Sequence, residues 1–411
     1  MTQSEKVELS GHVLDSGMLS RTLDDILELG GDYLIERFDV GKRPEDDSYA
    51  RITITAPDEV TLQSITQRLQ THGVNLVDPG EAVIKPVEQD GVFPIDFYSS
   101  TNLDTEVRVG ERWIRVGNPE MDCGLVVDEA AGTVRTVPVS DVRVGERVVC
   151  GAQGVRVILP PKEQADDSVF EFMNSVVSSE KPQALQVKQI AQHMRDVKAA
   201  GERILWVCGP AVVHTGAAPA MSALIDAGYV DVLFAGNALA THDIESAIYG
   251  TSLGVDLSKG SGVDHGHEHH IRAINQVRHH GSIAGAVEAG LIKTGVMAQM
   301  VRNNKPFVLV GSVRDDGPLP DVYTDVIEGQ RAMRGELGGV GYAIMVATML
   351  HAIATGNLLP AKIPLVCVDI NPATVTKLSD RGSAQATGVV TDIGLFMEQL
   401  AQELVPGYSA I

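Results

Sequence analysis

The sequence predicts an α/β protein in which a carboxyl-terminal, parallel-sheet domain follows a small α+β unit and a small β domain. Three observations predict this fold class. The 411 residues are enough for two or three domains of ~150 residues each. Short apolar strands alternate with patterned helices in the second half, and strands with glycine turns dominate a stretch before it. The composition, 44% hydrophobic and 21% charged, excludes global disorder.

The first segment, residues 1–105, is expected to form a ferredoxin-like α+β unit. One amphipathic helix is predicted over 19–29. A second begins after a cap at Asp58 and stops before Gly73. Strands are expected over 32–39, 49–55 and 75–83. The β-α-β-β-α-β rhythm is typical of such a unit.

The second segment, residues 106–160, predicts a small β-barrel or sandwich. Val, Ile and Arg alternate along it, and turns are marked by Gly110, Gly132, Gly145 and Gly154. The pair Pro160-Pro161, followed by an acidic run, predicts the boundary to the next domain.

The third segment, residues 161–411, predicts the α/β domain. Apolar strands are expected over 203–208, 230–235, 307–310 and 364–369, and helices over 222–227, 269–279 and 331–355. Continuous apolar strands between helices indicate a parallel sheet that is covered on both faces. The stretch 337–361 has no charge and is long enough to span a bilayer. Because glycines and polar residues dilute it, we interpret it as a buried helix.

Charge and cysteine usage limit the partners and the compartment. The chain has 33 basic and 54 acidic side chains, a net charge of −21, which argues against a nucleic-acid or anionic-membrane surface. Four scattered cysteines form no CxxC pair, which fits a reducing compartment. The first residues are polar and acidic and do not resemble a secretion signal. We therefore expect a cytoplasmic protein.

The turns that follow the apolar strands are the expected site, because ligands of open parallel sheets bind beyond the carboxyl ends of the strands. Gly or Asn and small polar residues open most of these turns. They are GPAVVHTGA (209–217), GNALATHDIE (236–245), GSVRDDGPLPD (311–321), INPATV after Asp369, and the strand end at Asp392. Each turn alone could owe these residues to its own geometry. Together on one edge they predict a nucleotide-sized site. The chain has neither a GxGxxG fingerprint nor a GxxxxGK[ST] loop.

Loop 311–321 is the richest in chemistry. Arg314 could clamp a substrate carboxylate with two hydrogen bonds. Asp315 and Asp316 could bind an ammonium group, and one of them could serve as a base. The alternative is a solvated loop whose carboxylates cap turns.

The histidine-rich run from His265 to His270 could hold a metal ion, since His265 and His269 would lie four apart on a helix. No second zinc-type motif accompanies it, so we favour polar pocket-wall or helix-start histidines and expect no resident metal. Cys123 could be a nucleophile, but its acidic neighbours would raise the thiol pKa. A small buried residue is the preferred interpretation.

Seven segments along the chain resemble one family. They are GHVLDSGMLSRTLDDI, GNPEMDCGLVVD, TVPVSDVRVGERVVCGAQGVRV, AGNALATHDIE, GHEHHIRAIN, GSVRDDGPLPDV and VTDIG. The family is the lysine-oxoglutarate reductase/saccharopine dehydrogenase (LOR/SDH) conserved region of archaea and bacteria, also found as the carboxyl-terminal part of cyanobacterial arginine dihydrolase fusions. The resemblance implies an NAD-dependent ornithine cyclodeaminase that makes proline and ammonia. It also implies a carboxyl-terminal domain similar to deoxyhypusine synthase, an NAD-binding fold without GxGxxG.

The resemblance, carried onto this sequence, implies the site. The cofactor-binding residues are expected to be Gly209, Pro210, Thr215, Ala235, Gly236, Asn237, Asp315, Asp369, Asn371 and Asp392. For catalysis we expect Arg314 as carboxylate clamp, Asp316 and Asp243 as base or ammonium partner, and His269 as proton shuttle. The catalytic-lysine motif GGGxPKH of deoxyhypusine synthases is absent, which disfavours imine chemistry on lysine.

The implied reaction is redox-neutral overall but needs a transient oxidation of the α-carbon by NAD, which stays bound. Two alternative functions remain possible from the sequence. A saccharopine-type amino-acid dehydrogenase would release NADH, and a regulatory protein would sense NAD or an amino acid without turnover. The resemblance further implies a homotetramer whose partner is the small-molecule substrate ornithine.

Overall fold

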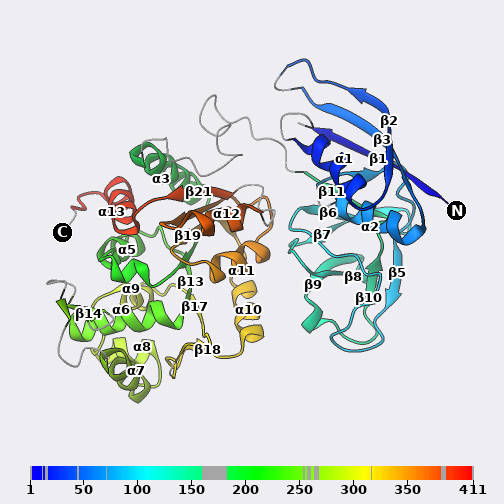
Figure 1. Ribbon diagram of the computed structural model, residues 1–411. Helices are drawn as coiled ribbons and strands as arrows, with labels where there is room; N and C mark the ends of the chain where they lie inside the picture. Colours follow the sequence, from blue (N-terminus) through cyan, green and yellow to red (C-terminus); the bar gives the residue numbers. More distant parts are fainter. Residues whose placement is uncertain are drawn as a thin grey trace. The chain divides into compact units, whose positions relative to one another are not determined.

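The computed structural model describes residues 2–11, 13, 17–43, 46–70, 72–159, 183–252, 255–256, 261–262, 268–315, 317–380 and 386–409. The chain forms two compact units, and Figure 1 labels many of their helices and strands. Unit 1 is Met1–Asp167 with Asn357–Lys362, and unit 2 is Ser168–Gly356 with Ile363–Ile411. The finer division into three domains, at residues 105 and 160, stays a proposal.

Unit 1 begins with a four-stranded antiparallel sheet and two helices. Its elements are β1 (Gln3–Gly11), α1 (Met18–Glu28), β2 (Asp32–Asp39), β3 (Ser48–Ala56), α2 (Glu59–Gln70) and β4 (Asn75–Leu76). The strand order β2-β3-β1-β4, with antiparallel pairs throughout, is the split β-α-β arrangement of ferredoxin-like units. Alternate apolar residues of β1 and β3 form one buried cluster with Ile26 of α1 and Ile65 of α2.

The single strand predicted over 75–83 is wrong. β4 ends at Leu76, and β5 (Val83–Pro86) pairs with β10 in a different sheet. Between them the chain turns at Pro79 and Gly80, and Gly80 has φ 61°, a left-handed conformation that favours glycine. A proline followed by a left-handed glycine interrupts the strand because neither fits a regular ladder.

The second sheet of unit 1 has seven strands in the order β11-β6-β7-β9-β8-β10-β5. Besides β5, its elements are β6 (Asp104–Val109), β7 (Arg112–Gly117), β8 (Gly124–Asp128), β9 (Thr133–Val137), η1 (Val139–Asp141), β10 (Arg147–Cys150) and β11 (Val155–Ile158). The Ala82 N–H, just before β5, donates to the Arg108 carbonyl of β6 at 3.0 Å, so the sheet curls back on itself. Val107, Leu125 and Val149 are buried inside it, as expected for a barrel-like β domain.

A short segment from the second half of the chain, Asn357–Lys362, completes unit 1. The Ala361 N–H donates to the Asn102 carbonyl at 2.7 Å, and the Met121 N–H donates to the Asn357 carbonyl at 3.0 Å. Leu103, Val157 and Ala361 bury one another. These contacts tie residues more than two hundred positions apart into one compact unit.

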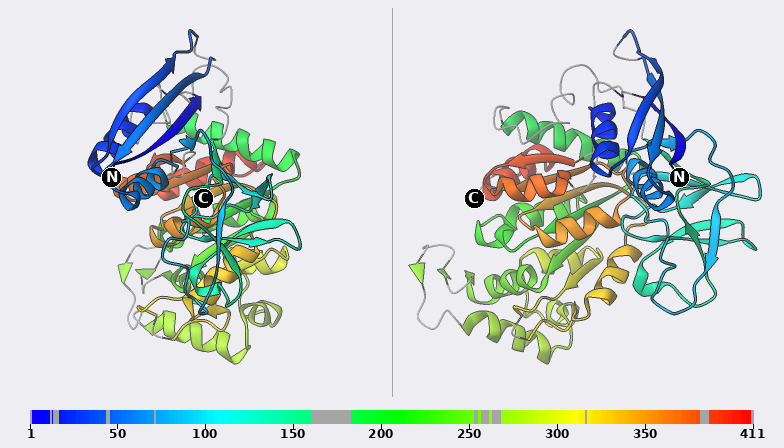
Figure 2. Two further views of the ribbon diagram at one scale, coloured as in Figure 1. Left: turned by 90° about the vertical axis from the view of Figure 1, so that its right-hand side faces the viewer. Right: turned by 45° about the vertical axis from the view of Figure 1, so that its right-hand side comes forward.

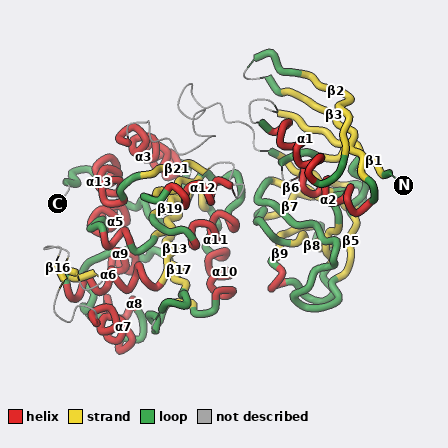
Figure 3. Tube along the Cα trace, in the orientation of Figure 1, coloured by secondary structure: helices red, strands yellow, loops and turns green. Residues whose placement is uncertain are grey.

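Unit 2 is built on a seven-stranded sheet in the order β18-β17-β13-β12-β19-β20-β21. Figure 3 labels β13, β17, β19 and β21 of this sheet. Its strands are β12 (Arg203–Cys208), β13 (Val232–Gly236), β17 (Phe307–Val310), β18 (Val322–Tyr323), β19 (Val340–Val346), β20 (Leu365–Asp369) and β21 (Ala386–Val390). Every neighbouring pair is parallel. The parallel-sheet domain predicted from the sequence is therefore confirmed.

Helices lie on both faces of this sheet (Figure 2). The helices of unit 2 are α3 (Gln183–Ala199), α4 (Ala211–His214), α5 (Ala218–Asp226), α6 (Asn237–Tyr249), α7 (His269–His279), α8 (Ile283–Glu288), α9 (Val296–Arg302), α10 (Val326–Gly335), α11 (Leu350–Leu358), α12 (Pro372–Asp380) and α13 (Ile393–Leu404). A small antiparallel sheet follows α6: β14 (Thr251–Ser252), β15 (Val255–Asp256) and β16 (Ser261–Gly262).

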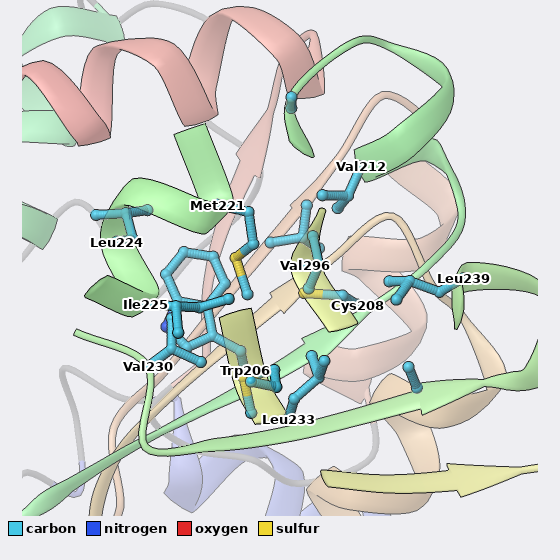
Figure 4. Close-up of a cluster of buried hydrophobic side chains, with 14 of the residues drawn as sticks. Trp206, Cys208, Val212, Met221, Leu224, Ile225, Val230, Leu233, Leu239 and Val296 are labelled. Carbon is cyan, nitrogen blue, oxygen red and sulfur yellow. The ribbon is translucent and has the colours of Figure 1, made fainter. Parts of the chain in front are cut away.

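Burial explains why the strands of unit 2 read as continuous apolar runs. Trp206 and Cys208 of β12 point into the core under α5, where Trp206 packs near Met221 and Ile225 (Figure 4). The indole N–H of Trp206 donates to the Tyr229 carbonyl at 2.9 Å, so its polar atom is satisfied. The alternate residues of β12 are equally buried, because helices cover the other face as well.

The long helix predicted over 331–355 is wrong. α10 ends at Gly335, β19 runs from Val340 to Val346, and α11 begins at Leu350. The uncharged stretch is apolar because it contains a central strand of a sheet covered on both faces, and seven apolar residues suit such a strand. Within the described ranges, no helix has the length and apolar character needed to cross a membrane.

Candidate active site

The sheet of unit 2 has the topology of a doubly wound nucleotide-binding fold. Numbered along the chain and without the two-residue strand β18, the strands run 3-2-1-4-5-6 across the sheet. The direction of winding reverses between β12 and β19. Ligands of such sheets bind at the carboxyl ends of the strands, beside this reversal.

A cleft lies at this position. Residues that follow four neighbouring strands, β17, β13, β12 and β19, or end them, line it: Cys208, Gly209, Pro210, Gly236, Asn237, Ala238, Leu239, Val310, Ser312, Asp315, Thr348 and His351. Gly209, Pro210, Gly236, Asn237 and Asp315 are among the residues expected from the sequence. Thr348 and His351 are not, because they follow the strand β19 that the sequence reading missed.

Close backbone packing builds the first turn of the cleft. The Gly209 N–H donates to the Val346 carbonyl at 2.8 Å, which joins the ends of β12 and β19. A Cβ atom at Gly209 would overlap the carbonyl oxygen of Ala347, so no side chain fits there. Ala347 itself has φ 52°, a left-handed conformation that is uncommon outside glycine. This turn therefore requires glycine for packing, as a cofactor-binding turn does.

Asn237 ties the second turn to the third. It opens α6, and its side-chain oxygen accepts the Leu319 N–H at 3.0 Å. Its amide nitrogen donates to Asp315 Oδ1 at 3.3 Å. The other carboxylate oxygen of Asp315 accepts the Ser312 N–H at 2.6 Å. The amide and the carboxylate thus fix the loop after β17 against α6.

His351 of α11 closes the cleft beside Gly236. A Cβ atom at Gly236 would lie 3.3 Å from His351 Cε1, so the ring packs over the glycine backbone. Burial lowers the pKa of His351, and the Asp315 carboxylate opposes that effect only in part. The cleft therefore contains a neutral imidazole at neutral pH.

Other residues expected to contact the cofactor lie outside the lining of the cleft. Ala235 is buried within β13. The exposed Thr215 donates its hydroxyl to the Ala211 carbonyl at 2.8 Å. Asp369 accepts the Asn371 N–H at 2.8 Å at the end of β20, and Asp392 accepts the Leu395 N–H at 2.9 Å as the cap of α13. Asp369 ends β20, Asn371 follows it, and Asp392 follows β21, all on the same edge of the sheet.

Asp243 has a structural environment. It is buried, and its two carboxylate oxygens accept the Val296 and Met297 N–H groups, each at 2.8 Å. Burial raises its pKa to about 6, although the two backbone hydrogen bonds oppose this. The Asp243 carboxylate caps α9 and does not line the cleft. Its hydrogen bonds therefore favour a structural role over a catalytic one.

The other residues singled out from the sequence are not among the described residues that line the cleft. Arg314 is exposed, on the loop after β17. Asp316 lies outside the described residues, as do His265 and His267. Among the residues that the structure describes, no group of three or more His, Cys, Asp and Glu side chains could hold a metal ion. Cys123 is buried in unit 1, as the preferred interpretation expects.

A second polar cluster lies at the far end of α6, and most of it was not singled out from the sequence. It contains His214, His242, Glu245 and Thr251, together with the predicted His269, whose Nδ1 lies 2.8 Å from Thr251 Oγ1. Three of its members stand within the turns selected by the strand-end argument or directly after them. His242 and Glu245 are three residues apart on α6, and this spacing is the sequence signal that would have predicted their contact.

The fold and the cleft define an α/β protein of the Rossmann class. Family models narrow this further. Residues 188–400 match the Rossmann fold of the C-terminal part of ArgZ-like arginine dihydrolases, residues 104–187 match its first region, and residues 4–103 match the LOR/SDH bifunctional enzyme conserved region. The chain belongs to this LOR/SDH, ArgZ-like family.

Two relatives named ornithine cyclodeaminase match along nearly their whole length. A protein of Methanothermobacter thermautotrophicus named ornithine cyclodeaminase is 50% identical over 98% of both chains. One of Methanocaldococcus jannaschii with the same name is 49% identical over 97% of this chain and 96% of its own. The crystal structure of the cyanobacterial arginine dihydrolase ArgZ matches 98% of this chain and 58% of its own, with 39% identity and a TM-score of 0.86. A crystal structure of AgrE in ternary complex with ornithine and NAD+ matches 98% of this chain and 57% of its own, with 42% identity and a TM-score of 0.53.

Proposed function

We propose that the chain is an NAD-dependent ornithine cyclodeaminase, which converts L-ornithine into L-proline and ammonia. One observation carries the proposal: the strand-end cleft belongs to a chain that matches relatives named ornithine cyclodeaminase over nearly their full length, at up to 50% identity. We further propose that it acts in the cytoplasm as a homotetramer.

The residues of the cleft fit NAD. Two strand-end glycines, Gly209 and Gly236, line the cleft at the switch point of the sheet, where such folds bind dinucleotides. Asn237, Ser312 and Thr348 add neutral hydrogen-bonding groups. The absence of GxGxxG is consistent with this fit, because the contact of Gly209 with Ala347 imposes glycine at the first turn without that spacing. When bound, NAD would supply a transient hydride acceptor.

The chain itself must orient the substrate and move protons. Arg314 is the proposed clamp for the carboxylate, since its exposed guanidinium stands on the loop that borders the cleft. His269 is the proposed proton shuttle and Asp316 the proposed base, both retained from the sequence. Asp315 holds the loop rather than the substrate, because both of its carboxylate oxygens accept hydrogen bonds from the chain.

The test is incubation of the purified protein with ornithine and NAD, with proline, ammonia and NADH measured together. Equal amounts of proline and ammonia without net NADH are expected. Accumulation of NADH would instead assign a saccharopine-type dehydrogenase. Binding of NAD without any product would favour a sensor, and either result would contradict the proposal.

A further inference from the structure

Helix α6 carries a buried carboxylate for which the cleft gives no role. Glu245 has 0% of its surface exposed. Its Oε2 lies 2.9 Å from His242 Nδ1, and its Oε1 accepts the Thr251 hydroxyl at 2.9 Å. Burying a carboxylate costs free energy unless the carboxylate is well hydrogen-bonded. The hydrogen bonds to His242 and Thr251 offset part of this cost and fix the position of the Glu245 carboxylate.

The hydrogen bonds fix where the protons are. Thr251 has one hydroxyl proton, which it gives to Glu245, so His269 Nδ1 must donate to Thr251 Oγ1 across 2.8 Å. An ionised carboxylate only accepts, so His242 Nδ1 donates to Glu245. Both imidazoles, when neutral, therefore keep Nε2 free of a proton. One buried carboxylate sets the tautomer of two histidines.

The surrounding side chains hold these rings in place. The Tyr249 ring stacks on His269 with centroids 4.7 Å apart, and Gln276 donates to the Tyr249 hydroxyl at 2.6 Å. On the other side, the ring of His214 lies 4.8 Å from that of His242, and His214 Nδ1 lies 2.7 Å from Ser252 Oγ. Burial, with His242 adding to it, lowers the pKa of His214. A neutral ring therefore packs against His242 at neutral pH.

The network shares two helical elements, α4 and α6, with the wall of the cleft. Ala238 lines the cleft, and His242 follows it by four residues on α6, with Glu245 three further on. Residues three and four apart lie on one face of a helix, so that face leads from the cleft to the network. His214 ends α4, four residues or about 6 Å of helix after Pro210, which also lines the cleft. Two elements thus carry histidines from the cleft into one cluster.

We propose that His242 Nε2 is a proton acceptor of the cyclodeaminase reaction and that Glu245 is a positioning residue, which acts by holding His242 in the Nδ1–H tautomer. The inference rests on the proposed function and adds to it residues that the sequence did not select. His269, the proposed shuttle, lies at the other end of the same hydrogen-bonded chain.

The proton transfer balances. An N–H bond of the substrate ammonium breaks, its electron pair stays on the amine nitrogen, and the proton binds His242 Nε2. The imidazolium that forms is stabilised by the Glu245 carboxylate. Later the same proton passes to the nitrogen that leaves as ammonia, so His242 returns to its starting state and no proton is consumed.

The test is a double-mutant cycle. Glu245→Gln keeps the shape of the side chain but removes its charge, and His242→Asn keeps a donor near the position of Nδ1 but removes Nε2. Each variant is expected to lower kcat by about a hundredfold or more, with the KM for ornithine and the affinity for NAD nearly unchanged. The double variant His242→Asn/Glu245→Gln is expected to be no slower than His242→Asn alone, because Glu245 acts through His242.

Matched controls are Glu288→Gln on α8 and His279→Asn on α7, two exposed positions outside the network, where wild-type kcat is expected. Thermal melting and NAD titration establish that each variant is folded. Undiminished kcat in His242→Asn, or losses that add in the double variant, would overturn the inference while wild-type turnover upholds the proposed function. A wild-type protein that makes no proline would overturn the proposed function and this inference with it.

Discussion

The two ends of helix α6 differ in what they are made of. At its first residues, the cleft is lined by Gly209 and Gly236, where a side chain would meet the Ala347 carbonyl or the His351 ring, and Asn237 fixes a loop. In its last turns, the histidine network is built from buried side chains around Glu245. The difference indicates that cofactor recognition here depends on backbone shape, whereas proton transfer depends on a few ionisable groups. Substitutions in the cleft should therefore weaken NAD binding, whereas substitutions in the network should lower kcat.

The largest effect is expected from Gly209→Ala. The new Cβ would overlap the Ala347 carbonyl, which cannot move without disturbing β19, so we expect a loss of several kcal/mol of stability together with NAD binding. Thermal melting and NAD titration measure both. Gly335→Ala is the matched control, because no atom stands within 4 Å of its Cβ position. Normal NAD affinity in Gly209→Ala would show that the first turn is not part of the cofactor site.

The next effect concerns Asp243, which belongs to neither region. Its pKa is about 6 in the folded chain, against about 4 when unfolded, so the stability it contributes is full below pH 4 and lost as the pH rises through 6. Two units correspond to about 3 kcal/mol. Asp243→Asn cannot titrate. The difference in unfolding free energy, wild type minus variant, should therefore fall by about that amount between pH 4 and 7 in urea titrations. A constant difference would contradict the account.

A smaller, selective effect is expected at Arg314. If its guanidinium clamps the substrate carboxylate, Arg314→Ala should raise the KM for ornithine about tenfold to a hundredfold, equivalent to roughly 1.4–2.8 kcal/mol, and leave NAD affinity unchanged. Steady-state kinetics and NAD titration separate the two. Arg302→Ala, an exposed position on α9, serves as control. An unchanged KM would exclude Arg314 from the substrate site.

The smallest effect is expected at Asp392, the cap of α13. Asp392→Ala removes the acceptor of the Leu395 N–H and should cost about 1 kcal/mol of stability. Since Asp392 does not line the cleft, NAD affinity should stay the same. Weaker NAD binding in this variant would extend the cofactor site to the end of β21.

Much of unit 2 could be predicted because its pattern is local. Helix α7 spans the residues predicted for it, and β12 does too, since its apolar run has the length of a strand and ends at Gly209. The strand-end rule then selected turns that contribute Gly209, Gly236, Asn237 and Asp315 to the cleft. Each of these residues stands directly at or after a strand that the sequence made visible.

The rest could not be predicted because it depends on tertiary contacts. The sequence of β19 also fits a buried helix, since a short apolar run gives no decisive period, and so the pattern does not point to Thr348 and His351. Asp243 and His242 are neighbours in the sequence, yet one caps α9 and the other joins the Glu245 network. Only the packing of α6 decides which of the two faces a helix end and which faces the cluster.

The most direct test of the central claim uses ornithine that carries ¹⁵N on its α-amine and deuterium on its α-carbon. The redox exchange closes within one bound cofactor in this account. It therefore predicts ¹⁵N in the ammonia, none in the proline, and deuterium retained at the α-carbon of the proline. Deuterium released as labelled NADH, or ¹⁵N retained in the proline, would contradict it.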